Sequence, residues 1–358
     1  MDFDFLIIGG GIAGVSAAAR LVEFGSVLLL EAESVLAHHA SGRSAALFEP
    51  RYGLAPVVAL SLASAAEYEA EPGLLTPRGL MILGRADQED RFAHDVETMA
   101  LKRISVAQAQ AMVPVINPKV VTQAAHADHA WDIDTDLLLQ GYARRVKTGG
   151  GRIVTGARVS AIAQRAGGWR VTTGLGDFTG TVLINAAGPW VDEVAAMAGV
   201  PPLGFTPLRR SMARIPAPGG HDVSRWPMIF GAGEGWYAKP DAGALIVSPA
   251  EEHPMPPHDA WADDMVLAEG LARYEEMVTE PVTRLLANWA GLRTFAPDRV
   301  LVIGRDLRVP SFFWLAGQGG YGFQTAPAAS RLAADLIVGR APEVGASLVS
   351  TLSPARFG

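Results

Sequence analysis

The feature that most constrains this chain is a run of glycines between two apolar stretches near its start. The first stretch, Phe3–Ile8, is almost wholly apolar and predicts a strand that is buried on both faces of a parallel sheet. Gly9–Gly14 follow at once and match G-x-G-x-x-G, and the Ala-rich stretch Val15–Phe24 then predicts a helix. A second apolar strand, Val27–Leu30, ends on Glu31. These residues predict a strand–turn–helix–strand unit.

The same unit has the features of a dinucleotide site. Gly9 allows the tight turn, Gly11 lets the backbone approach a pyrophosphate, and Gly14 lets helix and strand pack closely. Phosphates bind the free N–H groups at the positive end of the helix. Glu31 falls at the distance where an acid accepts hydrogen bonds from the adenosine ribose. A glycine turn that binds nothing is the alternative, but the complete context of the motif favours a bound dinucleotide.

Composition and charge narrow the class of protein. The chain has 358 residues, of which 49% are hydrophobic, and this length favours two domains. Its net charge of −7 argues against nucleic acid or an anionic membrane as a partner. It has no cysteine, which excludes disulfides, thiolate metal sites, iron–sulfur clusters and a cysteinyl-linked flavin.

No targeting segment is expected from the sequence. The first predicted strand begins at residue 3, which leaves no room for a signal peptide. No apolar run approaches the roughly 18–20 residues that span a bilayer. We therefore expect a cytoplasmic protein without a membrane span.

The predicted elements alternate between two kinds of structure. Helices are predicted at residues 55–70, 137–147, 260–277 and 324–338, with one or two more within 88–112. Strands are predicted at residues 80–84, 152–159, 169–173, 179–184, 299–303 and 312–316. Residues 207–249 alternate short strands with turn signals, as an antiparallel sheet does. The nucleotide-binding pieces are thus separated by a mainly β insertion, which favours a flavoprotein over a simple nicotinamide dehydrogenase.

This pattern predicts an α/β fold in which a Rossmann-type FAD-binding domain is interleaved with a mainly antiparallel-sheet (α+β) substrate domain. The FAD-binding domain is expected at residues 1–75, 148–200 and 288–345. The substrate-binding domain is expected at residues 76–147 and 201–287, which leaves 346–358 as a C-terminal tail.

Several motifs, in this order along the chain, resemble the D-amino acid oxidase superfamily of FAD-dependent amine oxidoreductases. They are Gly9–Gly14, Glu31, His39–Ser44, Asn185–Gly188 and Gly317–Gln324. Further stretches are most similar to the D-arginine dehydrogenase members of that family: Ser41–Ala46, Asp132–Asp136, Arg209–Ser211, Lys239–Gly243, Trp289–Arg293 and Gln318–Gly322. The resemblance runs nearly end to end and implies an enzyme that uses FAD to oxidise an amine.

The resemblance also implies which residues contact FAD. They are Gly9, Gly11, Ile12, Ala13, Gly14, Glu31, Ala32, His39, Ser41, Gly42, Arg43, Ser44, Ala45, Ala46, Val159, Ala187, Gly188, Trp190, Gly319, Gly320, Tyr321, Gly322, Phe323 and Gln324. The loop Gly317–Gln324 opens a helix, and helix N-terminal amides stabilise negative charge on a reduced flavin.

His39 raises the question of how FAD is held. Related dimethylglycine dehydrogenases attach FAD through a histidine in a stretch similar to His39–Gly42. We expect non-covalent FAD, with His39 behind the residues that touch it, and a histidyl linkage remains the alternative. The other histidines considered show no metal-binding spacing and are expected on the surface: His94, His126, His129, His221, His253 and His258. No metal is predicted.

The resemblance places a second set of residues around the substrate. Arg293 matches the arginine that binds the substrate carboxylate, a task that suits a planar guanidinium. Tyr237 matches a pocket tyrosine, Tyr52 a tyrosine of a substrate lid, and Arg210 a second arginine directed at the substrate. Gly320 and Gln324 are expected to form hydrogen bonds around the substrate amine and the flavin.

The chain departs from the D-arginine enzyme where the substrate side chain would lie. Leu47 stands near the position where the D-arginine enzyme has a histidine. That enzyme also has an acid near the position of Arg78–Met81, which neutralises the cationic substrate, and this stretch contains no acid. An unpaired buried guanidinium costs several kcal/mol, so arginine and lysine are poor candidates unless Glu49 replaces that acid. Together Leu47, Phe48 and Met81 predict an apolar pocket and a neutral or hydrophobic D-amino acid. The expected products are a 2-oxo acid and ammonia.

Other functions stay open at this point. A sarcosine- or glycine-oxidase-like amine oxidation and a 2-hydroxy acid oxidation both fit the same carboxylate clamp. An NAD-dependent dehydrogenase would be colourless, and a non-catalytic FAD-binding subunit would be yellow but inert. The electron acceptor, dioxygen or a quinone, is not readable from the motifs, nor is the oligomeric state, for which a monomer is compatible.

Overall fold

The N-terminal glycine motif lies at the centre of the first of two large sheets. In this computed structural model, which describes residues 2–358, β1 (Asp2–Ile8) lies between β2 (Val27–Leu30) and β12 (Gly176–Asn185) and runs parallel to both. The other strands are β9 (Arg152–Val154), β10 (Val159–Arg165), β11 (Gly168–Thr173), β19 (Val302–Arg305) and β20 (Phe312–Ala316). The order is β10-β11-β12-β1-β2-β9, and β20 pairs with β12 and with β19. Three adjacent parallel strands therefore end together at the glycine turn.

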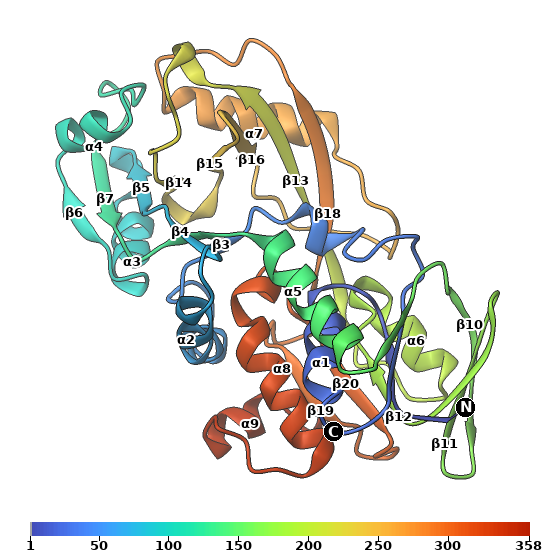
Figure 1. Cartoon of the computed structure of the whole chain (residues 1–358). Coiled ribbons are helices and arrows are strands. Elements are labelled where there is room, and N and C mark those ends of the chain that lie inside the picture. The colour runs from blue at the N-terminus through green and yellow to red at the C-terminus, as the bar shows by residue number, and fades with distance from the viewer. Residues whose placement is uncertain (1) are drawn as a thin grey trace.

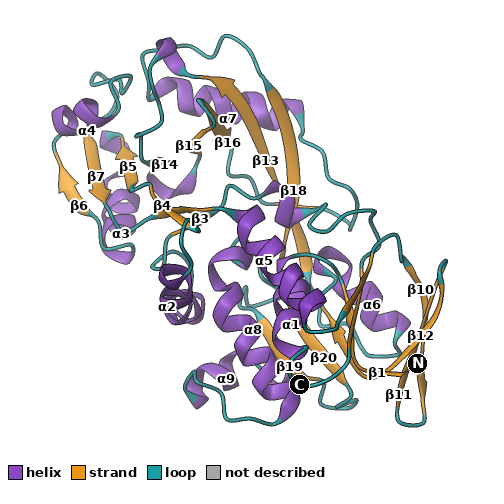
Figure 2. Ribbon diagram, viewed as in Figure 1, coloured by secondary structure: helices purple, strands orange, loops and turns teal. Residues whose placement is uncertain are grey.

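Helices cover both faces of this sheet (Figures 1 and 2). Alternate residues of β1 and β2 point to opposite faces, as the strand period requires. One face packs on α1 (Ile12–Leu21), α5 (Thr135–Thr148) and α8 (Gly322–Val338), with α2 (Ala55–Ala70) against α8. The other face packs on α6 (Val191–Met197). The strands β2 and β20 are buried on both sides, which explains why they are apolar throughout.

A second sheet of nine strands forms the upper half of Figure 1. Its strands are β5 (Leu80–Gly84), β6 (Lys102–Ile104), β7 (Gln123–Ala127), β13 (Thr206–Pro216), β14 (Met228–Gly231), β15 (Tyr237–Asp241), β16 (Ala244–Ser248), β17 (His253–Pro254) and β18 (Ala287–Phe295). The order is β17-β13-β16-β15-β14-β5-β7-β6, with β18 on β13. Every pair is antiparallel except β5 with β14.

Smaller elements complete this half of the molecule. Its helices are α3 (Glu89–Thr98), α4 (Val106–Met112) and α7 (Asp264–Glu276). A third sheet of three short strands joins β3 (Leu47–Phe48), β8 (Trp131–Ile133) and β4 (Leu75–Pro77) between the two halves. The predicted fold class, a Rossmann-type α/β half and a mainly antiparallel half, is confirmed.

Several predicted elements match residue for residue. They are the helix at 55–70 and the strands at 27–30, 80–84 and 312–316. Residues 88–112 differ, because β6 lies between the two predicted helices and pairs with β7. The helix predicted from residue 260 begins at Asp264, since the Asp263 carboxylate accepts the N–H groups of Met265 and Val266 and so caps it. Residues 346–358, expected as a tail, contain α9 (Ala346–Leu352), which packs on α2 and β19.

Two elements near the expected domain limits, α5 and β18, contact the half of the molecule opposite to the one predicted for their segment. α5, within the expected 76–147 segment, packs on α1 of the first half, and β18, within the expected 288–345 segment, pairs with β13 of the second half. The exact domain limits stay a prediction.

Within residues 2–358, no helix combines the length and apolar character needed to cross a bilayer.

Candidate active site

A long cleft starts at the glycine turn and continues into the space between the two halves. It has three connected parts, which we name the outer cleft, the inner cleft and the side cavity. The outer cleft, with a volume of about 350 Å³, contains Gly9, Glu31 and Trp190 in its walls. The inner cleft is lined by Ile12, Ser44, Gly319 and others, and it shares Gly11, Ser41 and Gly188 with the outer cleft. The parts therefore form one continuous groove.

The three motif glycines have different surroundings. A Cβ on Gly9 would lie 2.3 Å from the Ala186 carbonyl oxygen, and the φ of Gly9 is +111°. A Cβ on Gly14 would lie 2.0 Å from the Gly9 carbonyl oxygen, so no side chain fits there. A Cβ on Gly11 would lie 3.2 Å from Ser41 Oγ and would otherwise point into open space. Gly9 and Gly14 are therefore required by the fold itself, whereas Gly11 leaves room in the cleft.

Glu31 holds the wall of the outer cleft together. Its Oε2 accepts a hydrogen bond of 2.6 Å from the Gly10 N–H, and its Oε1 accepts one of 2.7 Å from the Glu33 N–H. Only 8% of Glu31 is exposed. Each carboxylate oxygen can accept a further bond, so a ribose hydroxyl can share the acid with the backbone.

Most of the residues predicted to contact FAD line this groove. The outer cleft contains Gly9, Gly11, Glu31, Ala32, His39, Ser41, Val159, Ala187, Gly188 and Trp190. The inner cleft contains Gly11, Ile12, Ala13, Ser41, Arg43, Ser44, Ala45, Gly188, Gly319, Gly320, Gly322 and Phe323. Ala46 and Gln324 line the side cavity. Gly14, Gly42 and Tyr321 are in none of these walls, since they support the turns behind them.

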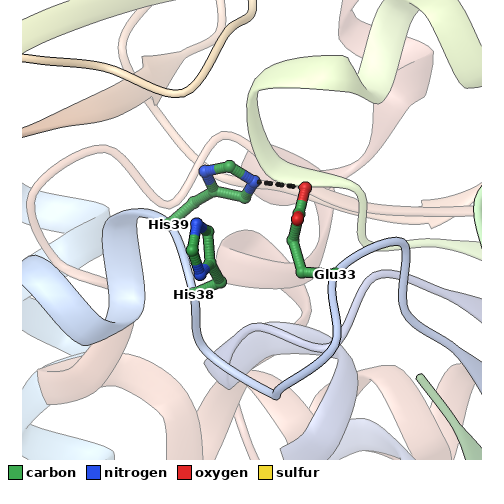
Figure 3. Close-up of side chains that lie close together, drawn as sticks. All are labelled: Glu33, His38 and His39. Atoms are coloured by element: carbon green, nitrogen blue, oxygen red, sulfur yellow. Dashed lines mark hydrogen bonds and ion pairs between the residues drawn. The ribbon is translucent and has the colours of Figure 1, made fainter. Parts of the chain in front are cut away.

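Three polar side chains of the outer cleft wall, Glu33, His38 and His39, lie close together (Figure 3). His39 Nε2 lies 3.2 Å from Glu33 Oε1. One ligand atom from each of the three residues lies within 4.8 Å of the other two, and such a set could hold a metal ion. Arg158 Nη2, however, donates to Glu33 Oε1 at 2.9 Å, and a guanidinium there opposes a second cation. The other ring nitrogen of His39 lies 3.7 Å from Asp259 Oδ1. Burial is the main reason why the pKa of His39 is lowered.

The side cavity opens from the inner cleft at Arg293. Both spaces share Ser44, Ala45, Arg293, Gly320 and Phe323. The guanidinium lies tightly against the glycine loop, because a Cβ on Gly320 would be 2.8 Å from Arg293 Nη1. The loop reaches this position through a hydrogen bond of 2.9 Å from the Gly319 N–H to the Thr294 carbonyl oxygen.

Two tyrosines and a glutamine surround the side cavity. Tyr237 is 2% exposed, and its hydroxyl has no hydrogen-bond partner among residues 2–358. The Tyr52 hydroxyl donates to Glu234 Oε2 at 2.8 Å, and burial together with Glu234 raises its pKa, which keeps it protonated. Gln324 Nε2 donates to the Tyr52 carbonyl oxygen at 3.3 Å. These contacts join Tyr52 to the glycine loop and to the turn between β14 and β15.

Arg210 is the second arginine that the resemblance directs at the substrate. It lines the inner cleft and not the side cavity. Its Nε donates to the Glu251 carbonyl oxygen at 3.0 Å, and its Nη2 to Glu252 Oε1 at 3.2 Å. Its strand position puts it on the same face as Arg293, diagonally across β13 and β18. Its role toward a substrate stays a prediction.

The apolar wall of the side cavity is built from residues that the sequence did not single out. Leu47 lines the cavity as expected, but Phe48 and Met81 are buried in two separate cores. Met81 faces away because side chains alternate along β5. The cavity is lined instead by Met99, Met228 and Phe230, where Phe48 and Met81 were expected. The pairing of β14 with β5, which brings Met228 and Phe230 there, leaves no signal in the local sequence.

Glu49 is the acidic side chain in the wall of the side cavity. It is 2% exposed, and its Oε1 accepts the Arg51 N–H at 2.9 Å. Its Oε2 has no hydrogen-bond partner among the described residues. Burial raises the pKa of Glu49 to about 8, against the opposing influence of the Arg51 N–H. The carboxyl is therefore mostly protonated at neutral pH.

This shifted pKa predicts a pH-dependent stability. The folded protein keeps a proton on Glu49 between its ordinary pKa of 4.5 and about 8, while the unfolded chain loses it. The free energy of unfolding should therefore fall as pH rises through this window, by up to about 1.4 kcal/mol for each unit between the two pKa values. We would measure urea unfolding of the FAD-saturated wild type and of the FAD-saturated Glu49→Gln variant. From pH 5.5 to 8 the free energy of unfolding should fall by more in the wild type than in the variant. Equal losses in both proteins would contradict the buried, protonated state.

Comparison with known proteins now decides the family. The family model for FAD dependent oxidoreductase (DAO) matches residues 4–336. The chain belongs to this family. It is 27% identical to a bifunctional tRNA 5-methylaminomethyl-2-thiouridine biosynthesis protein of Thiobacillus denitrificans, over 98% of this chain and 59% of that protein. It is 24% identical to human mitochondrial dimethylglycine dehydrogenase, over 99% of this chain and 44% of that protein.

The chain thus spans about half the length of these two curated relatives. Solved structures support the fold across the whole chain. Glycine oxidase from Geobacillus kaustophilus superposes with a TM-score of 0.83 at 20% identity, covering 98% of both chains. L-proline dehydrogenase from P. horikoshii superposes with a TM-score of 0.83 at 22% identity, covering 99% of this chain and 98% of that one.

As a DAO-family oxidoreductase the protein uses FAD. The groove fits this cofactor, because α1 begins at Ile12, with Gly11 as its N-cap, has no acidic residue in its first turn and leaves open space beside Gly11. The Ile12 N–H donates to Ser41 Oγ at 3.0 Å, which ties the helix end to the loop that carries Ser44 and Ala45.

Non-covalent attachment gives a direct prediction. Both ring nitrogens of His39 face carboxylates, Glu33 and Asp259, which orient the ring as a support. Acid precipitation of the yellow protein should therefore release all the FAD into the supernatant, and His39→Ala should keep a bound, releasable flavin. Flavin that stays with the precipitated wild-type chain but not with the variant would establish a histidyl link instead.

Proposed function

We propose that this FAD-dependent oxidoreductase deaminates a D-amino acid with a neutral side chain, giving a 2-oxo acid and ammonia. The observation that carries the proposal is the position of Arg293 where the cofactor groove meets the side cavity, whose walls include several apolar side chains. Bound FAD would supply the acceptor for the hydride on the substrate Cα, at flavin N5. The amine then loses a proton, and water hydrolyses the resulting imino acid.

The chain's own residues would bind and orient the substrate. The Arg293 guanidinium can hold the carboxylate through two parallel hydrogen bonds. The unpartnered Tyr237 hydroxyl can donate to the same carboxylate, since both residues line the side cavity. Gly320 and Gln324 lie in the same wall and can accept or donate around the amine. Tyr52, held by Glu234, can exclude water above them.

The walls of the cavity support a neutral side chain. Leu47, Met99, Met228 and Phe230 are apolar, and the cavity volume is about 50 Å³. A water needs about 10–15 Å³ on this measure, so the space suits a small or medium side chain. The acid expected in D-arginine-type relatives is missing from Arg78–Met81, and Glu49, the acidic side chain of this wall, has its pKa raised by burial to about 8. A mostly protonated carboxyl does not neutralise a cation, so a cationic substrate is disfavoured despite the motifs shared with that type.

An anaerobic visible spectrum tests the proposal. The purified protein should show flavin bands that bleach on addition of one or more neutral D-amino acids. Bleaching by sarcosine would select a sarcosine- or glycine-oxidase-like amine oxidation instead. Bleaching only by a 2-hydroxy acid would select a 2-hydroxy acid oxidation. Bleaching by D-arginine and D-lysine alone would refute a neutral side chain.

We propose a cytoplasmic enzyme, with dioxygen or a quinone reoxidising the flavin.

A further inference from the structure

One buried polar group of the side cavity has no task in the proposed reaction. Glu49 belongs to the connection between β3 and α2, and it lines the cavity together with Tyr52 and Met99. Its Oε1 is used by the Arg51 N–H, but its Oε2 has no hydrogen-bond partner within residues 2–358. A buried polar atom left unpaired costs about 1–3 kcal/mol. Such an atom in a cavity wall points to a ligand that pairs with it.

Neighbouring protein groups do not fill this role. His129, which the sequence placed on the surface, is half-buried, and its Nε2 lies 3.6 Å from Glu49 Oε2, beyond good hydrogen-bond distance. The same nitrogen lies 3.0 Å from the Met99 carbonyl oxygen and is already engaged there. The imidazole therefore lies beside the carboxyl without satisfying Oε2 of Glu49, a residue that lines the cavity.

The location of Glu49 fits the substrate side chain and not the reacting end. The side cavity meets the inner cleft at Ser44, Ala45, Arg293, Gly320 and Phe323. Glu49, Met99, Met228 and Phe230 line the side cavity but not the inner cleft. A substrate held at Arg293 with its Cα toward the cofactor groove must extend its side chain toward this far end.

We propose that Glu49 recognises the end of the substrate side chain and selects neutral side chains with a hydroxyl or carboxamide over aliphatic ones of the same size. This inference rests on the proposed deamination of a D-amino acid. A protonated carboxyl both donates and accepts a hydrogen bond, as a hydroxyl or carboxamide requires. The surrounding apolar side chains exclude water, so a purely aliphatic group would leave Glu49 Oε2 unpaired.

Isosteric substrate pairs test the inference on the FAD-loaded protein. We would measure anaerobic flavin reduction with D-asparagine against D-leucine and with D-threonine against D-valine. The polar member of each pair should have a kcat/KM about ten- to a hundredfold higher. Binding of the 2-oxo acid products, followed by the shift of the flavin spectrum, should show the same order in Kd without turnover.

Three variants assign the effect to Glu49. Glu49→Met should reduce the D-asparagine to D-leucine ratio about tenfold or more, whereas Glu49→Gln, which keeps a donor and an acceptor, should retain it. His129→Ala should also retain it. A wild-type ratio of one or less overturns the inference without any variant, and so does an unchanged ratio in folded, yellow Glu49→Met. D-Arginine as the best substrate, lost in Glu49→Gln, overturns it in favour of charge recognition.

The two proposals fail in different ways. If no D-amino acid bleaches the flavin, the proposed deamination fails and this inference fails with it. If D-amino acids bleach it but the isosteric pairs react equally, the deamination stands and only the role of Glu49 is refuted.

Discussion

Arg293→Met is expected to lower the kcat/KM for flavin reduction by about 30- to 5,000-fold, because removing one partner of a buried charge pair costs about 2–5 kcal/mol. Arg293 stands where the side cavity opens into the cofactor groove, against Gly320. In the variant the substrate carboxylate would enter a partly apolar space with no guanidinium to neutralise it. Stopped-flow reduction with the best D-amino acid measures the loss, and most of it should appear as weaker substrate binding.

Two further variants separate charge from geometry. Arg293→Lys should recover only part of the rate, since an ammonium ion cannot form the two parallel bonds of a guanidinium. Arg299→Lys changes an arginine whose side chain is 44% exposed and paired with Glu252 on the surface, and its effect should be within about twofold. All three proteins should keep the flavin spectrum of the wild type. A normal reduction rate in Arg293→Met would remove the central support for an amino acid substrate.

Gly11→Val is expected to give a folded but colourless protein. The backbone of Gly11 has φ −77°, which an L-residue adopts readily, and its Cβ would meet only Ser41 Oγ at 3.2 Å. The added side chain would instead fill the cleft where the pyrophosphate approaches the turn. Overpacking of this kind costs about 1–3 kcal/mol or more, so the Kd for FAD should rise about ten- to a hundredfold or beyond. Fluorescence titration of the stripped protein with FAD measures it.

Other glycines provide the controls. Gly141→Ala lies in α5, where a Cβ meets nothing within 4 Å, so FAD binding should be unchanged and the stability slightly higher. Gly14→Ala should destabilise the protein itself, because its Cβ would clash with the Gly9 carbonyl oxygen. Thermal unfolding of the stripped proteins distinguishes these cases. An unfolded Gly11→Val would mean that Gly11 serves the fold in the same way as Gly14.

Much of the cofactor groove was readable from the sequence because its signals are local. Gly9–Gly14 and Glu31 belong to one strand–turn–helix–strand unit of about thirty residues, and their spacing fixes their geometry. The strands β2 and β20 are buried and apolar throughout, and their bounds match the prediction. The strand predicted at residues 152–159 is instead the short β9 followed by the start of β10, and the one predicted at 299–303 is β19, at Val302–Arg305. The resemblance added the loops around Ser44 and Gly320, which do line the groove.

The substrate side of the site was decided by tertiary structure. The cavity residues come from elements that are far apart in the sequence: Arg293 from β18, Tyr237 from β15, Glu49 from the connection between β3 and α2, and Met99 from the end of α3. Only the pairing of β18 with β13, and of β14 with β5, brings such walls together, and no local pattern encodes which distant strands pair. Alternation along β5 turned Met81 away from the cavity while β14 brought Met228 into it.

The sequence by itself therefore determined the dinucleotide-binding unit, the fold class and the need for a flavin-sized groove, because short-range spacing and strand periodicity carry that information. The shape and polarity of the substrate cavity were decided by long-range strand pairing. That pairing also buried Glu49 in the cavity wall and left its Oε2 without a hydrogen-bond partner among residues 2–358. The burial of a single carboxyl depends on every element packed around it, which no stretch of sequence specifies alone.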